Sequence, residues 1–189
     1  MSKLIIGLGN PGKKYENTPH NLGREVVESL AEKLNFPKFQ EKKKIFSAIS
    51  SKIIQEEQVI LAQPLCFMNE SGKSANALFK FFKVKEEDIW VVHDDLDIDW
   101  GKIKISKNRG AAGHHGVESV IQSLGTKNFW RFRIGIRPEK LLLPPEIYVL
   151  KKINKSKQKE KQEIIEKSIE IIVSALKKIR KPQLSSWGF

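Results

Sequence analysis

The chain has 189 residues, and its 34 lysine and arginine side chains against 22 aspartate and glutamate side chains give a formal net charge of +12. Its single cysteine, Cys66, excludes an internal disulfide framework, and no apolar run approaches the roughly 20 residues that a membrane helix needs. We therefore expect a cytoplasmic protein without a membrane segment. The basic charge favours a phosphate-rich partner such as nucleic acid, although a lysine-rich proteome would give the same charge.

The first predicted elements are a strand, a turn and a helix. Leu4–Leu8 is a short apolar run that predicts a buried strand, and Asn10-Pro11-Gly12 must turn after it. Apolar residues then recur at helical spacing. They predict an amphipathic helix that begins at His20 or Asn21 and ends before Pro37.

The middle of the chain predicts a strand pair, a helix and a second buried strand. Phe46–Ile54 and Gln58–Gln63 have the pattern of paired strands, with Glu56-Glu57 at the turn. Ser71 can cap a helix that carries its apolar residues on one face. Ile89–Val92 is a buried strand that runs into a histidine and several aspartates.

The last third of the chain continues the alternation of strands and helices. Lys102–Ile105 alternates like a half-exposed strand, Val117–Leu124 predicts a short helix, and Phe132–Ile136 has alternate residues on one face of a further strand. Ile165–Ile179 has the spacing of a long helix whose other face is lysine and glutamate. This helix lies in a segment, residues 151–189, where 11 basic and four acidic side chains give +7.

The order of these elements predicts the fold class. Strands that alternate with helices indicate an α/β protein, and we find no internal repeat or linker that would divide it. We expect one domain over residues 1–181, with a mixed, mostly parallel twisted sheet flanked by helices and a long C-terminal helix. Residues 182–189 have no periodicity, so we expect a flexible tail.

A glycine-rich motif near the N-terminus has the spelling of a dinucleotide-binding fingerprint. It reads Gly7-Leu-Gly9-Asn-Pro-Gly12. That fingerprint needs a helix that begins inside the glycine run, so that backbone amides meet the pyrophosphate. Here Pro11 removes one amide and Pro19 delays the helix, so the sequence argues against a nucleotide site of this kind.

Histidines and aspartates gather at the boundaries of predicted elements. All four histidines, His20, His93, His114 and His115, occupy such positions, where side chains are often presented to a substrate. Four aspartates, Asp94, Asp95, Asp97 and Asp99, follow a buried strand. They could hold a metal ion, or one of them could orient a histidine while the others lie in a solvated turn. The spacing leaves both interpretations open.

Two further motifs have the composition of RNA-binding surfaces. Asn69 lies just before a predicted helix, and Phe67 beside it suits stacking on a base, while Cys66 is interpreted as a small buried residue. The stretch from Lys102 to Arg109 carries four cations, and three arginines lie on the strand around Phe132. Arg133 alternates with Ile134, so we expect it to be exposed or at the edge of a site, as part of a phosphate clamp or a solvated strand face.

These motifs occur in one order, and that order resembles the bacterial peptidyl-tRNA hydrolase family. The blocks are Gly7-Leu-Gly9-Asn-Pro-Gly12, Tyr15, His20-Asn21-x-Gly23, Phe67-Met68-Asn69-x-Ser71-Gly72, His93-Asp94-Asp95-Leu96-Asp97, Gly113-His114-x-Gly116 and Arg133-Ile-Gly-Ile. The resemblance runs from residue 4 to about residue 150 with near-constant spacing, and the long C-terminal helix fits the family's architecture. Each block alone is weak evidence, whereas the ordered set is specific.

The resemblance implies a monomeric hydrolase that uses no metal and no cofactor. It would cleave the ester bond between a peptide and the 3′ end of tRNA, and so recycle tRNA from stalled or prematurely released peptidyl-tRNA. His20 matches the general base that activates water, and Asp94 matches the aspartate that holds and polarises it. Asn10 matches the residue that reads the peptide main chain and rejects unblocked aminoacyl-tRNA. Asn69 matches the amide that positions the substrate and polarises its carbonyl.

The resemblance also implies a set of contacts to the peptide and the tRNA. The aromatic residues Tyr15 and Phe67 match substrate contacts, and Met68 and His114 lie beside them in the family blocks. Lys104 and Arg133 match cations associated with tRNA phosphate. General chemistry agrees with this assignment, because base-activated water with one or two oxyanion donors can cleave an ester without a covalent nucleophile.

Three positions depart from the family pattern. His115 replaces a substrate-binding asparagine, so one hydrogen-bond donor remains where an amide offers both a donor and an acceptor. Ser106 replaces a usual basic residue, and the usual glycine between Ile136 and Arg137 is missing. These changes bear on substrate affinity more than on the reaction.

Two other functions remain open at the level of sequence. One is a tRNA-binding relative with weak catalysis, although Asn10, His20, Asn69 and Asp94 are all kept. The second is a metal-dependent phosphoesterase built on the aspartates and the His114-His115 pair. Assays of hydrolysis with N-blocked and free aminoacyl-tRNA distinguish a hydrolase from the first alternative. Activity that resists a chelator would exclude the second alternative.

Overall fold

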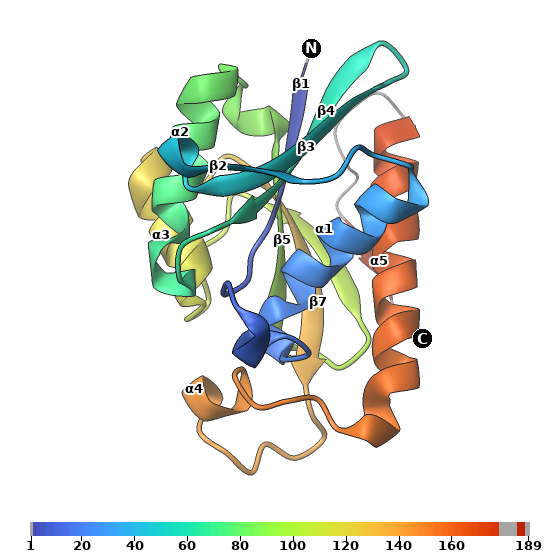
Figure 1. Cartoon of the computed structure of the whole chain (residues 1–189). Helices are drawn as coiled ribbons and strands as arrows, with labels where there is room; N and C mark the ends of the chain where they lie inside the picture. Colours follow the sequence, from blue (N-terminus) through green and yellow to red (C-terminus); the bar gives the residue numbers. More distant parts are fainter. Residues whose placement is uncertain (1, 178–184, 188–189) are drawn as a thin grey trace.

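The computed structural model describes residues 2–177 and 185–187, and in this part of the chain eight strands form one sheet (Figure 1). The strands are β1 (Ser2–Gly7), β2 (Gln40–Lys42), β3 (Ser47–Ile54), β4 (Glu57–Pro64), β5 (Ile89–Asp99), β6 (Ile103–Lys107), β7 (Trp130–Arg137) and β8 (Ser185–Trp187). The α-helices are α1 (Leu22–Lys33), α2 (Ser71–Phe82), α3 (His115–Leu124), α4 (Pro145–Tyr148) and α5 (Gln158–Lys177).

The sheet has a parallel centre and antiparallel edges. Its strand order is β2-β3-β4-β1-β5-β7-β6-β8. β1 pairs in parallel with β4 and β5, and β5 pairs in parallel with β7, while the outer pairs are antiparallel. The predicted α/β class with a mixed sheet is therefore confirmed. Parallel strands need helical crossovers, which explains why helices cover both faces.

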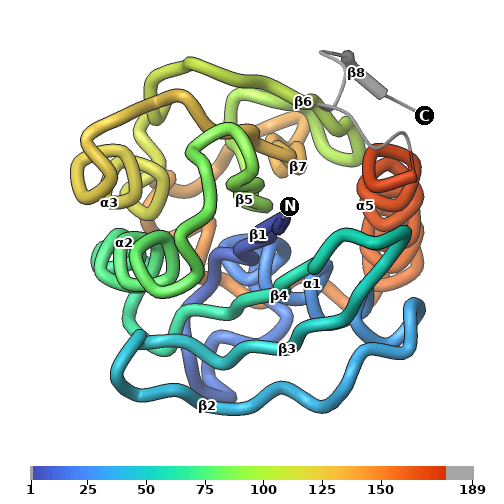
Figure 2. The backbone as a smooth tube through the Cα atoms, turned by 90° about the horizontal axis from the view of Figure 1, so that it is seen from above, coloured from blue at the N-terminus to red at the C-terminus, as the bar shows by residue number. Residues whose placement is uncertain are grey.

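Apart from the short α4, the described helices form one layer on each side of the sheet, as the view from above shows (Figure 2). α1 and α5 pack on one face and α2 and α3 on the other. Successive residues of β1 point into opposite cores: Ile5 joins the α1/α5 core, and Leu4 and Ile6 join the α2/α3 core. Because both faces of β1 are buried, its sequence is a continuous apolar run rather than an alternating one.

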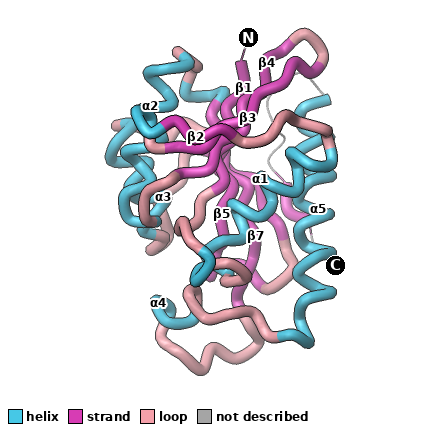
Figure 3. Tube along the Cα trace, viewed as in Figure 1, coloured by secondary structure: helices cyan, strands magenta, loops and turns pink. Residues whose placement is uncertain are grey.

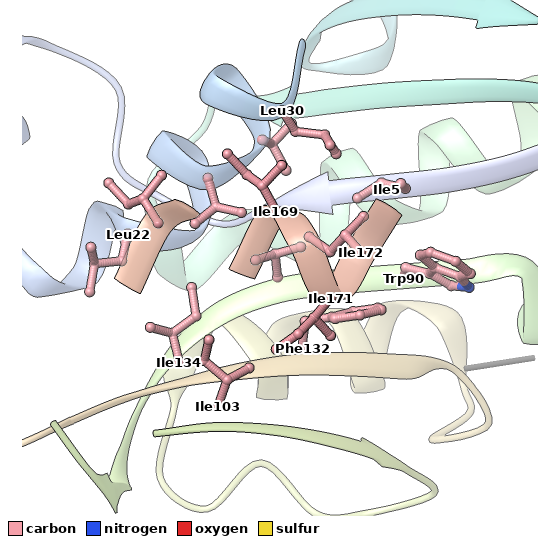
Figure 4. Close-up of a cluster of buried hydrophobic side chains, with 14 of the residues drawn as sticks. Ile5, Leu22, Leu30, Trp90, Ile103, Phe132, Ile134, Ile169, Ile171 and Ile172 are labelled. Atoms are coloured by element: carbon pink, nitrogen blue, oxygen red, sulfur yellow. The ribbon is translucent and has the colours of Figure 1, made fainter. Parts of the chain in front are cut away.

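The core under α1 and α5 is the larger of the two. Figure 4 shows Ile169 and Ile172 of α5 packed toward Leu30 of α1, Ile5 of β1 and Phe132 of β7, which are all fully or almost fully buried. The predicted long C-terminal helix is thus present, and its apolar face seals the sheet. Burial of such side chains stabilises a fold by about 1.5–3 kcal/mol each.

The structure corrects three local predictions. Ser71 does not cap α2, because its Oγ donates to the carbonyl of Met68 (2.8 Å) and the 3₁₀ turn Met68–Glu70 leads into the helix. The tight turn between β3 and β4 lies one residue earlier than predicted, at Gln55 and Glu56, which have φ of 47° and 65°. β5 extends to Asp99 instead of ending at Val92, because it keeps pairing with β7.

The end of the chain is described only in part. Of the predicted tail, Ser185–Trp187 form β8, which pairs with β6, and the other residues lie outside the described ones. α5 is described to Lys177, so the predicted helix end at Ile179 also lies outside them. Among the described helices, which Figure 3 colours cyan, none is long and apolar enough to cross a membrane.

Candidate active site

Two adjoining cavities lie just beyond the point where the parallel pairing of β1 with β5 ends, and His20 lines both of them. One, of about 320 Å³, is also lined by Asp94, Asp95 and His114. The other, of about 270 Å³, is lined by a second set of predicted residues: Asn10, Tyr15, Phe67, Met68, Asn69 and His115. The carboxyl ends of parallel strands are the usual place for active sites in α/β sheets.

His20 is fixed against β5 by a close approach of α1. It lies in the 3₁₀ turn Pro19–Asn21 that precedes α1, and its backbone N–H donates to Val149 (3.0 Å). A Cβ on Gly23, one helical turn later, would lie 2.2 Å from the carbonyl oxygen of Val92. Only glycine therefore lets the start of α1 touch β5 where Asp94 follows.

The His20 imidazole is paired with a buried carboxylate. Its Nδ1 lies 3.0 and 3.1 Å from the two oxygens of Asp94, which is 2 % exposed. Nδ1 therefore donates to Asp94, and the lone pair of Nε2 is left to accept a proton. A neutral imidazole held in this tautomer has the arrangement of a general base.

The charges in this pair shift both pKa values. Burial alone would lower the pKa of His20, but the charge of Asp94 and its hydrogen bond outweigh burial and raise it. Burial would raise the pKa of Asp94, but His20 and His114 hold the pKa of this carboxyl well below its usual range. Asp94 is thus ionised at neutral pH and stabilises the imidazolium that forms when His20 takes a proton.

Asn10 is held in one orientation by three hydrogen bonds. Its Oδ1 accepts the backbone N–H of Met68 (2.8 Å), its own N–H donates to Asn21 Oδ1 (2.8 Å), and its carbonyl accepts Asn21 Nδ2 (3.0 Å). Because Oδ1 is committed to the protein, the Nδ2 amino group is the part of the side chain left to meet a ligand. Asn21, for which the sequence motifs implied no role, therefore positions Asn10.

The rim of the smaller cavity carries exposed aromatic and polar side chains. Phe67 is 51 % exposed, and its ring meets that of the half-buried Tyr15 edge to face, with ring centroids 6.2 Å apart. Asn69 and His115 are also exposed. The structure therefore brings together Asn10, His20, Phe67, Asn69 and His115, whose blocks are far apart in the sequence.

The comparisons with known proteins agree on one family. The sequence model of the family described as peptidyl-tRNA hydrolase matches residues 4–186. A peptidyl-tRNA hydrolase from Shouchella clausii is 39% identical over 176 residues, which cover 93% of this chain and 94% of the relative. One from Mycobacterium ulcerans is 40% identical over 165 residues, which cover 87% of this chain and 86% of the relative. The chain belongs to the peptidyl-tRNA hydrolase family.

A solved structure supports the same assignment. The crystal structure of peptidyl-tRNA hydrolase from Acinetobacter baumannii has a TM-score of 0.81 and 32% sequence identity, and the match covers 93% of this chain and 86% of that one. The family reaction is hydrolysis of the ester bond of peptidyl-tRNA. The sequence-based prediction of family, fold and reaction is therefore confirmed.

Three residues predicted to contact the substrate are buried in this hydrolase. Arg133 was expected to be exposed or at the edge of a site: it is not exposed (7 %), and its Nε donates to Asp95 (2.7 Å), which lines the larger of the two cavities. Met68 is 4 % exposed and packs where a Cβ on Gly116 would clash with it. His114 is 9 % exposed and bonds to Asp94. Lys104, opposite Arg133 in the β6–β7 ladder, is exposed but lies outside the two cavities described.

Three of the four aspartates have separate partners, so the four do not form one cluster. Asp94 pairs with the histidines and Asp95 with Arg133, whereas the exposed Asp99 pairs with Lys102 and Arg137. They lie within β5, so alternate side chains point to opposite faces of the sheet. In the described chain, the group with metal-ligand spacing is instead His20, Asp94 and His114, whose ligand atoms lie within 4.8 Å of one another.

The far wall of the site is formed by residues that no sequence motif indicated. Glu146 of α4 and Val149, just after it, line both cavities. The segment between β7 and α5 has no hydrophobic periodicity, so the sequence carried no signal that it would fold over the site.

Cys66, which was expected to be buried, is half-buried, and its Sγ bonds to the carbonyl of Glu70 (3.3 Å).

Proposed function

We propose that this hydrolase cleaves peptidyl-tRNA with His20 as the general base, and that it works as a monomer in the cytoplasm. The observation that carries the proposal is the pairing of His20 Nδ1 with Asp94 at 3.0 Å beside both cavities. That pairing fixes the tautomer in which Nε2 is basic. Histidine is also the side chain whose usual pKa suits proton transfer near neutrality.

The step follows from these positions. Nε2 of His20 takes a proton from a water molecule as the water oxygen attacks the ester carbonyl carbon. The tetrahedral intermediate then collapses and the bond to the 3′ ribose oxygen breaks. The imidazolium returns its proton to that oxygen, so the products are a free peptide and tRNA with a 3′ hydroxyl. Asp94 remains ionised and stabilises the imidazolium throughout.

The remaining residues hold the substrate. We assign Asn69, exposed beside His20 in the smaller cavity, to the ester carbonyl, whose developing negative charge its amide can stabilise. Asn10 Nδ2 would donate to a main-chain carbonyl of the peptide. Tyr15, Phe67 and His115 line the same rim and would contact the ends of peptide and tRNA. Lys104 is proposed as a phosphate contact, and Arg133 is not, because its guanidinium is paired with Asp95.

A metal-dependent reaction is the alternative that the spacing of His20, Asp94 and His114 raises. The hydrogen bonds favour the metal-free reaction. Each imidazole places an N–H donor against the carboxylate, at 3.0 Å for His20 and 3.0 Å for His114. A metal ion would need these nitrogens without their protons.

The test is release of tRNA from N-blocked and from free aminoacyl-tRNA, with and without a chelator. We expect rapid hydrolysis of the blocked ester only, unchanged by chelator, and a loss of about 10²–10⁴ in kcat for His20→Ala. Binding of tRNA should survive this substitution. Full activity of His20→Ala would refute the mechanism, inhibition by chelator would favour the metal-dependent alternative, and binding without hydrolysis by the natural enzyme would indicate a tRNA-binding relative.

A further inference from the structure

The Asp94 carboxylate has two imidazole partners. His20 Nδ1 lies within 3.1 Å of both of its oxygens, and His114 Nε2 lies 3.0 Å from Oδ1. The His114 side chain is only 7% exposed, and its ring centroid lies 4.7 Å from that of His20. A mechanism that needs only a base and its aspartate leaves this second imidazole without a role.

The hydrogen bonds of His114 determine where its proton lies. Its Nδ1 accepts the backbone N–H of Val117 (3.2 Å), as the N-cap of α3. A ring nitrogen that accepts an N–H cannot carry a hydrogen itself, so the proton must be on Nε2, which faces Asp94. His114 is therefore a neutral donor, and both of its nitrogens are committed to the protein.

We propose that His114 is a positioning residue that sets the proton affinity of His20 through the carboxylate that they share. The proposal rests on the proposed role of His20 as base. A carboxylate that accepts an extra hydrogen bond is a better stabilised anion and attracts a neighbouring imidazolium less strongly. Without that bond, Asp94 would hold the proton on His20 more tightly, and less of the base would be free at neutral pH.

The N-terminus of α3 makes this arrangement rigid. The ring of His93 packs against His114 almost perpendicularly, with centroids 4.8 Å apart, and fixes the plane of His114 from the β5 side. His93 is fully buried and its pKa is lowered to about 3, by burial first, so it adds no charge here. The other titratable groups that line the cavity with His20 and His114 are Asp95, Asp97, His115 and Glu146.

Two substitutions separate the functions of the two ring nitrogens. In His114→Asn the short amide oxygen can still cap α3, since asparagine is a favoured N-cap, but it cannot reach Asp94. In His114→Gln the longer amide can still donate to Asp94. We expect the acid limb of the kcat/KM profile of His114→Asn to move up by about one pH unit, a typical environmental shift. In His114→Gln the limb should stay near its natural position, even if kcat falls.

The Michaelis constant decides between positioning and substrate binding. Since both nitrogens are used within the protein, KM for N-blocked aminoacyl-tRNA should change less than twofold in His114→Asn. A tenfold rise in KM with an unmoved acid limb would make His114 a substrate ligand and overturn the proposal. An acid limb of the kcat/KM profile that stays in place or moves to lower pH in a folded His114→Asn enzyme would also overturn the proposal. If His20→Ala is inactive when this result is found, the role of His114 is refuted and the role of His20 as base stands.

A measurement on the natural enzyme avoids any question of folding. The ¹⁵N chemical shifts of the His114 ring report which nitrogen carries the proton. We expect the hydrogen on Nε2 and none on Nδ1, which accepts the Val117 N–H. Observation of a hydrogen on Nδ1 would refute the proposal.

Discussion

In this site, two polar side chains each use one polar atom for a hydrogen bond to the protein and leave a second polar atom for the substrate. Asn10 uses Oδ1 on the Met68 amide, and His20 uses Nδ1 on Asp94, so that an amino group in one case and a ring nitrogen in the other remain for the substrate. A group held in this way loses little freedom when the substrate binds. Positioning of this kind can lower a reaction barrier substantially, because orientation is fixed before the reaction.

Replacement of Asp94 by asparagine tests the orienting carboxylate. An amide carries no charge and can hold His20 in the wrong tautomer, so we expect kcat of Asp94→Asn to fall about 10²–10⁴-fold. Steady-state kinetics on N-blocked aminoacyl-tRNA measure this. Asp99→Asn is the matched control, because that carboxylate is exposed and pairs with Lys102 and Arg137. Equal losses in both variants would argue against a specific role for Asp94.

His115 makes a second prediction at this scale. It is exposed at the cavity rim, where the family usually has an asparagine. A neutral imidazole offers the substrate one donor, whereas a protonated imidazole offers two donors and a charge that attracts phosphate. As the pH falls toward 6, KM of the natural enzyme should decrease relative to that of His115→Asn, while kcat falls in both as His20 gains a proton. Superimposable KM profiles from pH 5.5 to 8 would mean that His115 does not contact the substrate.

At the scale of elements, the β6–β7 ladder separates a structural cation from a candidate tRNA contact. Lys104 and Arg133 are paired in register, but Lys104 is exposed and Arg133 is buried against Asp95. Removal of one partner from a buried ion pair typically destabilises a protein by about 3–5 kcal/mol. Arg133→Met should therefore lower the free energy of unfolding by about that amount, as measured by urea denaturation.

Lys104→Ala, unlike Arg133→Met, should leave stability unchanged and weaken tRNA binding. We expect its unfolding free energy to stay within about 0.5 kcal/mol of the natural value, because the side chain is exposed. Its affinity for tRNA should fall, and the dependence of log affinity on log salt should flatten by about one phosphate contact. Unchanged salt dependence in Lys104→Ala would remove this lysine from the binding surface.

The same ladder illustrates what the sequence could and could not predict. Alternation correctly placed Arg133 and Ile134 on opposite faces of β7, since side chains alternate in any strand. It could not say that both faces are buried, because that depends on distant segments: the Arg131 guanidinium, on the same face as Arg133, bonds to Gly110 in the loop before α3. The ordered motifs predicted His20, Asp94 and Asn10 together, whereas Glu146 and Val149 came from a segment with no periodic pattern.

At the scale of the whole molecule, charge and pH act on the fold as well as on the site. Three buried polar side chains lie together on β5 and β7, where His93, Asp95 and Arg133 share a face of the sheet. Burial would raise the pKa of Asp95, but the hydrogen bond and charge of Arg133 help to lower it overall. The fold therefore depends on keeping Asp94 and Asp95 ionised, and this contribution is lost only in strong acid, as the pH falls below about 4 toward their lowered pKa values.

His93 should make stability depend on pH in a milder range. It is fully buried, and burial above all lowers its pKa to about 3, against about 6.5 for an unfolded histidine. Below pH 6.5 His93 therefore binds a proton in the unfolded chain but not in the folded protein. Below pH 6.5 the free energy of unfolding should fall by up to about 1.4 kcal/mol for each pH unit from this residue alone.

His20 has the opposite sign, so the two contributions can be separated. Its raised pKa adds stability that is fully present below pH 6.5 and is lost as the pH rises through the folded value. Between pH 6 and 4.5, His93 is the one of these two histidines that still makes the free energy of unfolding depend on pH. Urea denaturation at several pH values across that range measures this dependence. For His93→Gln the slope of the free energy of unfolding against pH should be smaller than for the natural protein by about one proton. His115→Asn, an exposed histidine, is the control, and equal slopes in the natural protein and His93→Gln would mean that His93 is protonated inside the fold.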